Sequence, residues 1–161
     1  ESEDDCPETR PGDYLPQGCF VMKVICNREK LAHAFQSVSA VVPARSPKPI
    51  LQNVKMEVTA DSTTLMATDL EVGIRYLVAG VEVEAPGAAV LPVSRFGSIL
   101  RESSDETFRM ESDDKGTTIQ GERSQFKQPS EDANDFPMDA AYAESSIYEV
   151  PHRVFRELIR R

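Results

Sequence analysis

The stretch MKVICNREKLAHAFQSVSAVV, residues 22–42, decides the fold. Its first residues, MKVIC, predict a short strand. An amphipathic helix follows, because apolar residues recur at the three- and four-residue spacings of one helical face. Polar residues, including His33, lie on the other side and predict a solvated face. The apolar positions are Leu31, Ala34, Phe35, Val38, Val41 and Val42.

Short strand patterns and turn signals continue downstream. A second helix is predicted over 91–103, because Pro92 suits its first turn. Its buried side would be formed by Phe96, Ile99 and Leu100. The sequence thus predicts an α+β domain, with two helices packed on mostly antiparallel β-sheets. The predicted strands are 54–59, 63–68, 72–78, 81–84, 106–112, 117–122 and 124–128, and the predicted turns are APGA (85–88) and DDKG (113–116).

Composition and charge limit the class of protein. The 161 residues carry a formal net charge of −9, which argues against a protein that coats nucleic acid with a basic surface. A locally basic face stays compatible with that charge. No stretch reaches the roughly 18 apolar residues of a membrane helix, and Cys6, Cys19 and Cys26 lack the spacing of a zinc site. We therefore expect a cytoplasmic protein with no membrane anchor, no metal and no cofactor.

Three segments of unequal length are expected along the chain. Residues 1–21 are acidic and interrupted by three prolines, which predicts a disordered extension. Residues 22–143 hold the main domain. Residues 144–161 repeat the opening pattern of a short strand followed by an amphipathic helix. We interpret this last segment as the first strand and helix of a second, truncated copy of the domain.

Basic residues are informative by position. On the last predicted helix, three arginines recur at three- and four-residue spacings opposite the apolar side. Such a stripe is either a solvated face or a surface that meets phosphates. Two more basic residues lie in the proline-rich loop at 43–49, where long side chains project, and both readings stay open for them as well. These residues are Arg153, Arg156 and Arg160 on the helix, and Arg45 and Lys48 in the loop.

Catalytic signatures are scarce in the sequence. It contains no P-loop, no G-x-S-x-G, no H-E-x-x-H and no G-x-G-x-x-G. A small hydrolase that uses His33, Asp69 and Glu71 stays as one alternative, although Asp69 at a strand junction is more typical of a turn acceptor. An α+β adaptor that binds peptides along a sheet edge is the other alternative. The pattern as a whole favours a protein that is not an enzyme.

Several segments, taken in order, resemble the N-terminal domain of the bacterial DNA polymerase III β subunits, the sliding clamps. Each segment is a weak signal alone, but their order and spacing together are specific. The resemblance extends from Met22 to Arg161. The segments are MKVICNREKLAHAFQSVSAVVPARSPKPILQNVKMEV (22–58), LMATDLEVGI (65–74), VLPVSRFGSIL (90–100), RSQFK (123–127) and NDFP (134–137).

The resemblance implies a DNA clamp domain that is repeated three times per chain, with two chains closing head to tail into a ring around duplex DNA. It implies a non-catalytic processivity factor whose partners are DNA polymerase III and the clamp loader, bound through later domains. Helices would line the channel, so that basic side chains contact the DNA backbone without reading sequence. The residues implied in DNA binding are Arg45, Lys48, Arg153, Arg156 and Arg160.

The resemblance also implies a homodimer interface. In clamps it uses the second helix of this domain and a nearby edge strand. Two positions depart from the family pattern: Ser94 stands where some clamps carry a second basic residue, and Gln128 replaces an apolar residue. We expect Gln128 to weaken the packing of its strand. The implied interface residues are Arg95, Phe96, Ile99, Arg123, Gln125 and Phe126.

Overall fold

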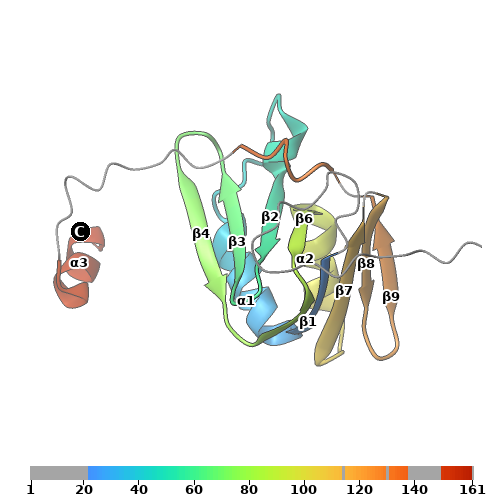
Figure 1. The fold of residues 1–161 in the computed structure, drawn as a ribbon. Helices are drawn as coiled ribbons and strands as arrows, with labels where there is room; N and C mark the ends of the chain where they lie inside the picture. The colour runs from blue at the N-terminus through green and yellow to red at the C-terminus, as the bar shows by residue number, and fades with distance from the viewer. Residues whose placement is uncertain (1–21, 114, 130, 138–149, 161) are drawn as a thin grey trace, which may run out of the picture.

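Two antiparallel sheets and a pair of helices form the body of the protein (Figure 1). The computed structural model describes residues 22–113, 115–129, 131–137 and 150–160. The α+β fold predicted from the sequence is confirmed. The predicted disordered extension at 1–21 and the predicted strand within 144–149 lie outside the described residues.

The sheets have five and four strands and share no strand. The five-stranded sheet has the order β5-β1-β7-β8-β9, and the four-stranded sheet has the order β4-β3-β2-β6. The first sheet contains β1 (Met22–Asn27), β5 (Val81–Ala85), β7 (Thr107–Asp113), β8 (Gly116–Gln120) and β9 (Gln125–Gln128). The second sheet contains β2 (Asn53–Val58), β3 (Thr63–Thr68), β4 (Gly73–Val78) and β6 (Gly87–Pro92).

Four helical segments complete the described part of the chain. Helix α1 begins directly after β1 because the side chain of Asn27 accepts a hydrogen bond from the Lys30 backbone N–H at 3.1 Å, which satisfies a donor of the first turn. Helix α2 begins at Val93, directly after Pro92, whose extended backbone forms the N-cap and ends β6, so the helix starts two residues later than predicted. The helices are α1 (Arg28–Ser39), the 3₁₀ turn η1 (Pro49–Gln52), α2 (Val93–Glu102) and α3 (His152–Ile159).

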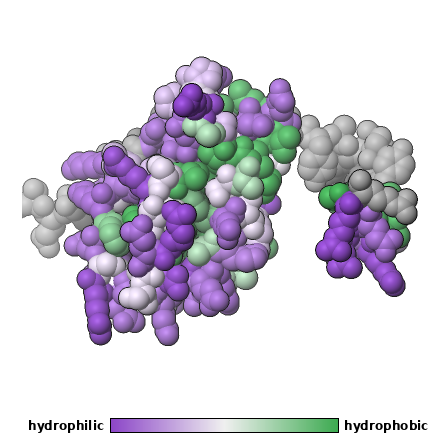
Figure 2. Space-filling model, turned by 180° about the vertical axis from the view of Figure 1, so that it is seen from behind, coloured by the Kyte–Doolittle hydropathy of each residue, from purple (hydrophilic) through white to green (hydrophobic). Residues whose placement is uncertain are grey.

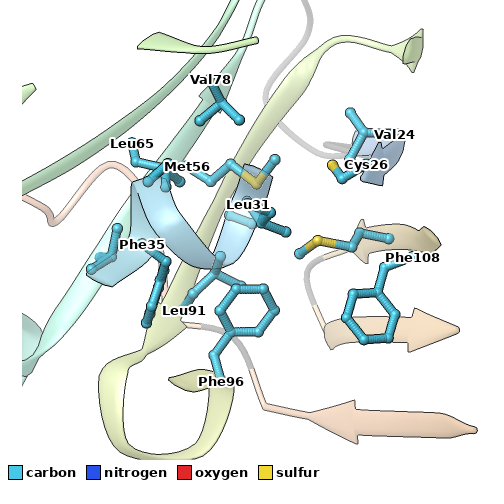
Figure 3. Close-up of a cluster of buried hydrophobic side chains, with 14 of the residues drawn as sticks. Val24, Cys26, Leu31, Phe35, Met56, Leu65, Val78, Leu91, Phe96 and Phe108 are labelled. Carbon is cyan, nitrogen blue, oxygen red and sulfur yellow. The ribbon is translucent and has the colours of Figure 1, made fainter. Parts of the chain in front are cut away.

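The core is built where α1 and α2 pack against each other and against the sheets. Leu31 and Phe35 of α1 point into the same cluster as Phe96 of α2 (Figure 3). The rings of Phe35 and Phe96 meet edge to face, with centroids 4.9 Å apart. Met56 and Leu65 bring the four-stranded sheet into this cluster. The two helices are therefore fixed by their inner sides, and only their outer sides are available to partners.

Strand β6 is the main departure from the predicted secondary structure. The sequence predicted a turn at 85–88, but Gly87–Pro92 pairs antiparallel with β2 along its whole length. Only Pro86 separates β5 from β6, and these two strands belong to different sheets. The proline and glycine therefore mark the point where the chain passes from one sheet to the other, which is not a hairpin turn.

Candidate nucleic-acid and subunit interfaces

The loop between α1 and η1 carries the first two predicted DNA contacts. Arg45 and Lys48 are both exposed, as the prolines around them led us to expect. The Ser46 hydroxyl accepts a hydrogen bond from the Lys48 backbone N–H at 3.1 Å, which orders the loop just before η1 begins at Pro49. Two long cationic side chains are thus presented on one short loop.

The electrostatic surroundings of Lys48 include several acids. A groove of about 610 Å³ is lined by Lys48 and Ile50 together with acidic residues of the 131–137 segment. Carboxylates in the same groove attract the ammonium group and repel phosphates. Arg45 does not line this groove, so it is the stronger candidate for a DNA contact. The lining residues are Pro47, Lys48, Pro49, Ile50, Glu131, Asp132 and Asp135.

Helix α3 carries the other three predicted DNA contacts. Arg153, Arg156 and Arg160 are exposed, but so is every other described residue of the helix. Figure 2 shows hydrophobic and hydrophilic residues side by side on the surface of this helix. Because the whole helix is exposed, exposure does not single out its arginines, and their role in DNA binding stays a prediction. The exposed large apolar side chains of α3 are Val154, Phe155, Leu158 and Ile159.

The predicted subunit interface falls on α2 and on the region from the β8–β9 turn into β9. Arg95 on α2 and Arg123 in the turn are exposed. Ile99 and Phe126 are partly buried against the core, so each presents only part of its side chain. Gln125 is exposed at the start of β9, which is the outer strand of its sheet among the described residues.

Phe96 requires a correction. Its side chain is 0% exposed and packs against Phe35, so it has no surface for a subunit partner. The physical reason is the helical period: Phe96 and Leu100 are four residues apart and share the side of α2 that faces the core. The same spacing was visible in the sequence and was enough to assign Phe96 to the core.

The TDLE segment forms a self-contained turn between β3 and β4. The Asp69 carboxylate accepts hydrogen bonds from the backbone N–H groups of Glu71 and Val72, at 2.9 and 2.7 Å. The Thr68 hydroxyl accepts from the Leu70 N–H and donates to the Val72 carbonyl. Leu70 has a positive φ of 80°, which this network stabilises. These hydrogen bonds hold the pKa of Asp69 below its ordinary value.

The hydrolase alternative receives no support from this geometry. Asp69 is occupied as a turn acceptor, and the His33 ring lies against Tyr76, with Nδ1 3.5 Å from its hydroxyl. Burial raises the pKa of the Cys26 thiol to about 12, which makes that thiol a poor nucleophile. Among the described residues, no group of three or more His, Cys, Asp or Glu side chains is arranged to hold a metal ion.

Sequence reasoning missed Asp105, which connects the two parts of the predicted interface. It is 6% exposed, and its carboxylate accepts hydrogen bonds from Ser103 and Ser124, one residue at each part. The Ser-Ser-Asp run after α2 was the available signal, because these residue types often cap turns. The contact with Ser124, however, joins residues 19 positions apart.

No described helix of the protein has the length and apolar character needed to span a membrane.

Comparison with known proteins places this geometry in a family. A model of "DNA polymerase III beta subunit, N-terminal domain" matches residues 22–140. The beta sliding clamps of Chlamydia pneumoniae and Escherichia coli K12 are 27% and 29% identical over 141 residues. These matches cover 87% and 86% of this chain, but only 38% of each relative.

Solved structures of clamps have the same fold. The DNA polymerase III subunit beta of Pseudomonas aeruginosa superposes with a TM-score of 0.79 at 27% identity, over 87% of this chain and 38% of that one. The sliding clamp of Bacillus subtilis has a TM-score of 0.80 at 24% identity, over 86% of this chain and 39% of that one. The chain therefore belongs to the DNA polymerase III beta subunit family, the beta sliding clamps, and residues 22–140 match the N-terminal domain of that family.

Proposed function

We propose that this chain is the first domain of a ring-shaped sliding clamp that encircles duplex DNA and tethers DNA polymerase III. The family match over residues 22–140 carries the proposal. The chain spans less than two fifths of the relatives it matches, so the ring itself is an inference from the family. In this role the protein performs no bond chemistry and works in the cytoplasm. Neither the adaptor nor the hydrolase alternative is favoured by the family match.

The charge of the protein supports a ring that holds DNA by topology. A net charge of −9 disfavours tight, general adhesion to a polyanion. A closed ring needs no such adhesion, and a few salt-screened contacts to phosphates leave it free to slide. The exposed Arg45 is the main contact that we propose in this domain, and Lys48 contributes less because acids share its groove.

We assign the subunit interface to the exposed parts of α2 and of the β8–β9 region. Arg95 and Ile99 contribute from α2, and Arg123, Gln125 and Phe126 from the turn and from β9. A second copy of the full-length protein would supply the opposite surface. Polymerase and clamp loader would bind elsewhere in the full-length protein.

The segment 144–161 would begin a second clamp domain. The exposed apolar residues Phe155, Leu158 and Ile159 support this proposal, because an amphipathic helix needs a surface on which to bury its apolar side. In the ring, the remainder of that domain would cover them. Arg153, Arg156 and Arg160, on the same helix, would then point toward DNA.

A primer-extension assay tests the proposed function. The full-length protein, supplied with DNA polymerase III and the clamp loader, should lengthen the products made per binding event on a long single-stranded template. The rate per nucleotide should change little, because a clamp retains the polymerase without taking part in catalysis. Product lengths that are unchanged by the protein, with an active polymerase and loader, would contradict the proposal.

A further inference from the structure

A buried carboxylate joins the two elements of the proposed interface. Asp105 lies between α2 and β7, and its Oδ2 accepts hydrogen bonds from the Ser124 hydroxyl at 2.6 Å and from the Ser103 hydroxyl at 3.1 Å. Ser103 directly follows the last residue of α2, and Ser124 directly precedes β9. One side chain therefore contacts the end of the helix and the beginning of the strand.

The hydrogen bonds favour the ionised form of this carboxylate. The Ser124 hydroxyl is the main reason that the pKa of Asp105 lies below its ordinary value, and partial burial opposes it. The Ser103 hydroxyl and the backbone N–H and positive charge of Arg123 lower the pKa further. Arg123 is one of the proposed interface residues. The carboxylate thus acts on the turn from which Arg123 projects.

The segment that carries Asp105 is itself anchored to the core. The Arg28 guanidinium donates from Nε to the Asp105 carbonyl at 2.8 Å and from Nη1 to the Leu100 carbonyl at 3.1 Å. The Arg28 backbone N–H donates to the Glu106 carbonyl at 2.9 Å. The start of α1 therefore fixes the end of α2 and the backbone on both sides of the Asp105 side chain.

The β8–β9 turn is packed tightly against this carboxylate. The Gly121 N–H donates to the Ser124 carbonyl at 2.8 Å and closes the turn. A Cβ atom at Gly121 would overlap the Asp105 carboxylate, so only glycine lets the turn approach so closely. The position of Arg123 is thus determined by a side chain outside its own hairpin.

We propose that Asp105 is a positioning residue of the subunit interface. Its carboxylate holds the β8–β9 turn and the start of β9 in a fixed position relative to α2. This inference rests on the proposed function. Without the carboxylate, the turn keeps its own backbone hydrogen bond but loses its fixed position relative to the helix. Arg123, Gln125 and Phe126 then meet a partner in several positions, and the dimer dissociates faster.

The test compares two carboxylates near opposite ends of β7. Asp105→Asn removes the positioning charge, and Asp113→Asn is the matched control, because Asp113 accepts from the Lys115 and Gly116 N–H groups within the β7–β8 hairpin and so holds its own turn. We expect Asp105→Asn to raise the dimer dissociation constant of the full-length protein about tenfold, which corresponds to one charge-assisted hydrogen bond. Sedimentation over a dilution series measures this constant.

Hydrogen exchange separates positioning from a general loss of stability. Asp105→Asn should accelerate exchange of the amides at 121–126, while Asp113→Asn should accelerate exchange only around 113–116 and leave the dimer constant unchanged. Equal weakening of the dimer by both variants would overturn the positioning role, because it would reflect stability alone.

A third variant, Arg123→Ala, distinguishes a failure of the positioning role of Asp105 from a failure of the proposed interface. If Arg123→Ala weakens the dimer and Asp105→Asn does not, the interface stands and the positioning role is wrong. If the parent protein does not dimerise at all, the proposed function fails first. Should Asp105→Asn not fold, Ser124→Ala removes the shorter of the two hydroxyl contacts and replaces it in the same comparison.

Discussion

At the residue scale, Gln128 is a buried polar side chain whose loss of contact with water is not offset by hydrogen bonds among the described residues. It is 3% exposed, and neither its amide nitrogen nor its amide oxygen has a hydrogen-bond partner among the residues that the structure describes. An unpaired buried polar group costs about 1–3 kcal/mol. The expectation that Gln128 weakens its strand follows from the sequence, but the missing partners are visible only in the fold.

Gln128→Met should stabilise the protein. Methionine has a similar volume and no amide, so the free energy of unfolding should rise by about 1–3 kcal/mol. Denaturant unfolding measures the change, with Gln125→Met on the exposed side of the same strand as the control. A destabilised Gln128→Met variant would mean that the amide is satisfied in solution.

Three aspartates should make the protein less stable in acid. The pKa values of Asp69, Asp105 and Asp113 lie below the ordinary 3.8, mainly because of backbone N–H donors at the first and third and the Ser124 hydroxyl at the second. A lowered folded-state pKa stabilises the fold above the ordinary pKa, and this contribution is lost as the pH falls through the folded-state value.

Urea unfolding between about pH 6 and about pH 3 checks this prediction. The free energy of unfolding should fall toward the acid end, and the fall should be smaller in Asp105→Asn, which has no carboxylate to protonate there. An equal fall in parent and variant would contradict the assigned role of the Asp105 carboxylate.

Arg45→Ala should weaken DNA contact equally on all sequences. In the full-length protein, the slope of log affinity against log salt should decrease by roughly 1, because one phosphate contact is lost. The free energy of unfolding should change by less than about 0.5 kcal/mol, as is usual for exposed sites. Lys48→Ala is the matched variant and should have a smaller effect; a larger effect would overturn the ranking of the two residues.

At the element scale, one face of α2 packs into the core and the opposite face is available to a second subunit. Phe96→Ala should cost about 3–5 kcal/mol of folding free energy, because it opens a cavity against Phe35. Arg95→Ala, on the adjacent exposed position, should change stability by less than about 0.5 kcal/mol. Thermal or denaturant unfolding of both variants checks the assignment. A loss of less than about 1 kcal/mol in the free energy of unfolding of Phe96→Ala would contradict the assignment of Phe96 to the core.

Elements whose apolar residues recur with a clear periodicity could be predicted from the sequence. The apolar spacing of α1 and the short strand MKVIC before it indicated both elements, and the structure has them at Met22–Asn27 and Arg28–Ser39. Strand β6 could not be predicted, since GAAVLP has small residues and a continuous apolar run in place of alternation. The link from Asp105 to Ser124 depends on the packing of a turn against a helix end, which no local pattern encodes.

At the scale of the whole molecule, the fold and the family follow from the sequence, while the ring is an inference. The order of short motifs along residues 22–137 was specific enough to indicate the clamp domain, and the family match confirms it. The subunit interface was less predictable, because the resemblance placed Phe96 there while the helical spacing placed it on the buried side of α2. The structure confirms the spacing, since Phe96 is buried.

Topological retention tests the central claim most directly. The full-length protein is loaded by the clamp loader onto nicked circular duplex DNA, freed of unbound protein, and followed before and after a restriction enzyme cuts the circle once. A ring that holds DNA by encirclement should stay on the circle and slide off the linear product. Equal retention on circular and linear DNA would show binding by contact alone and would contradict the account.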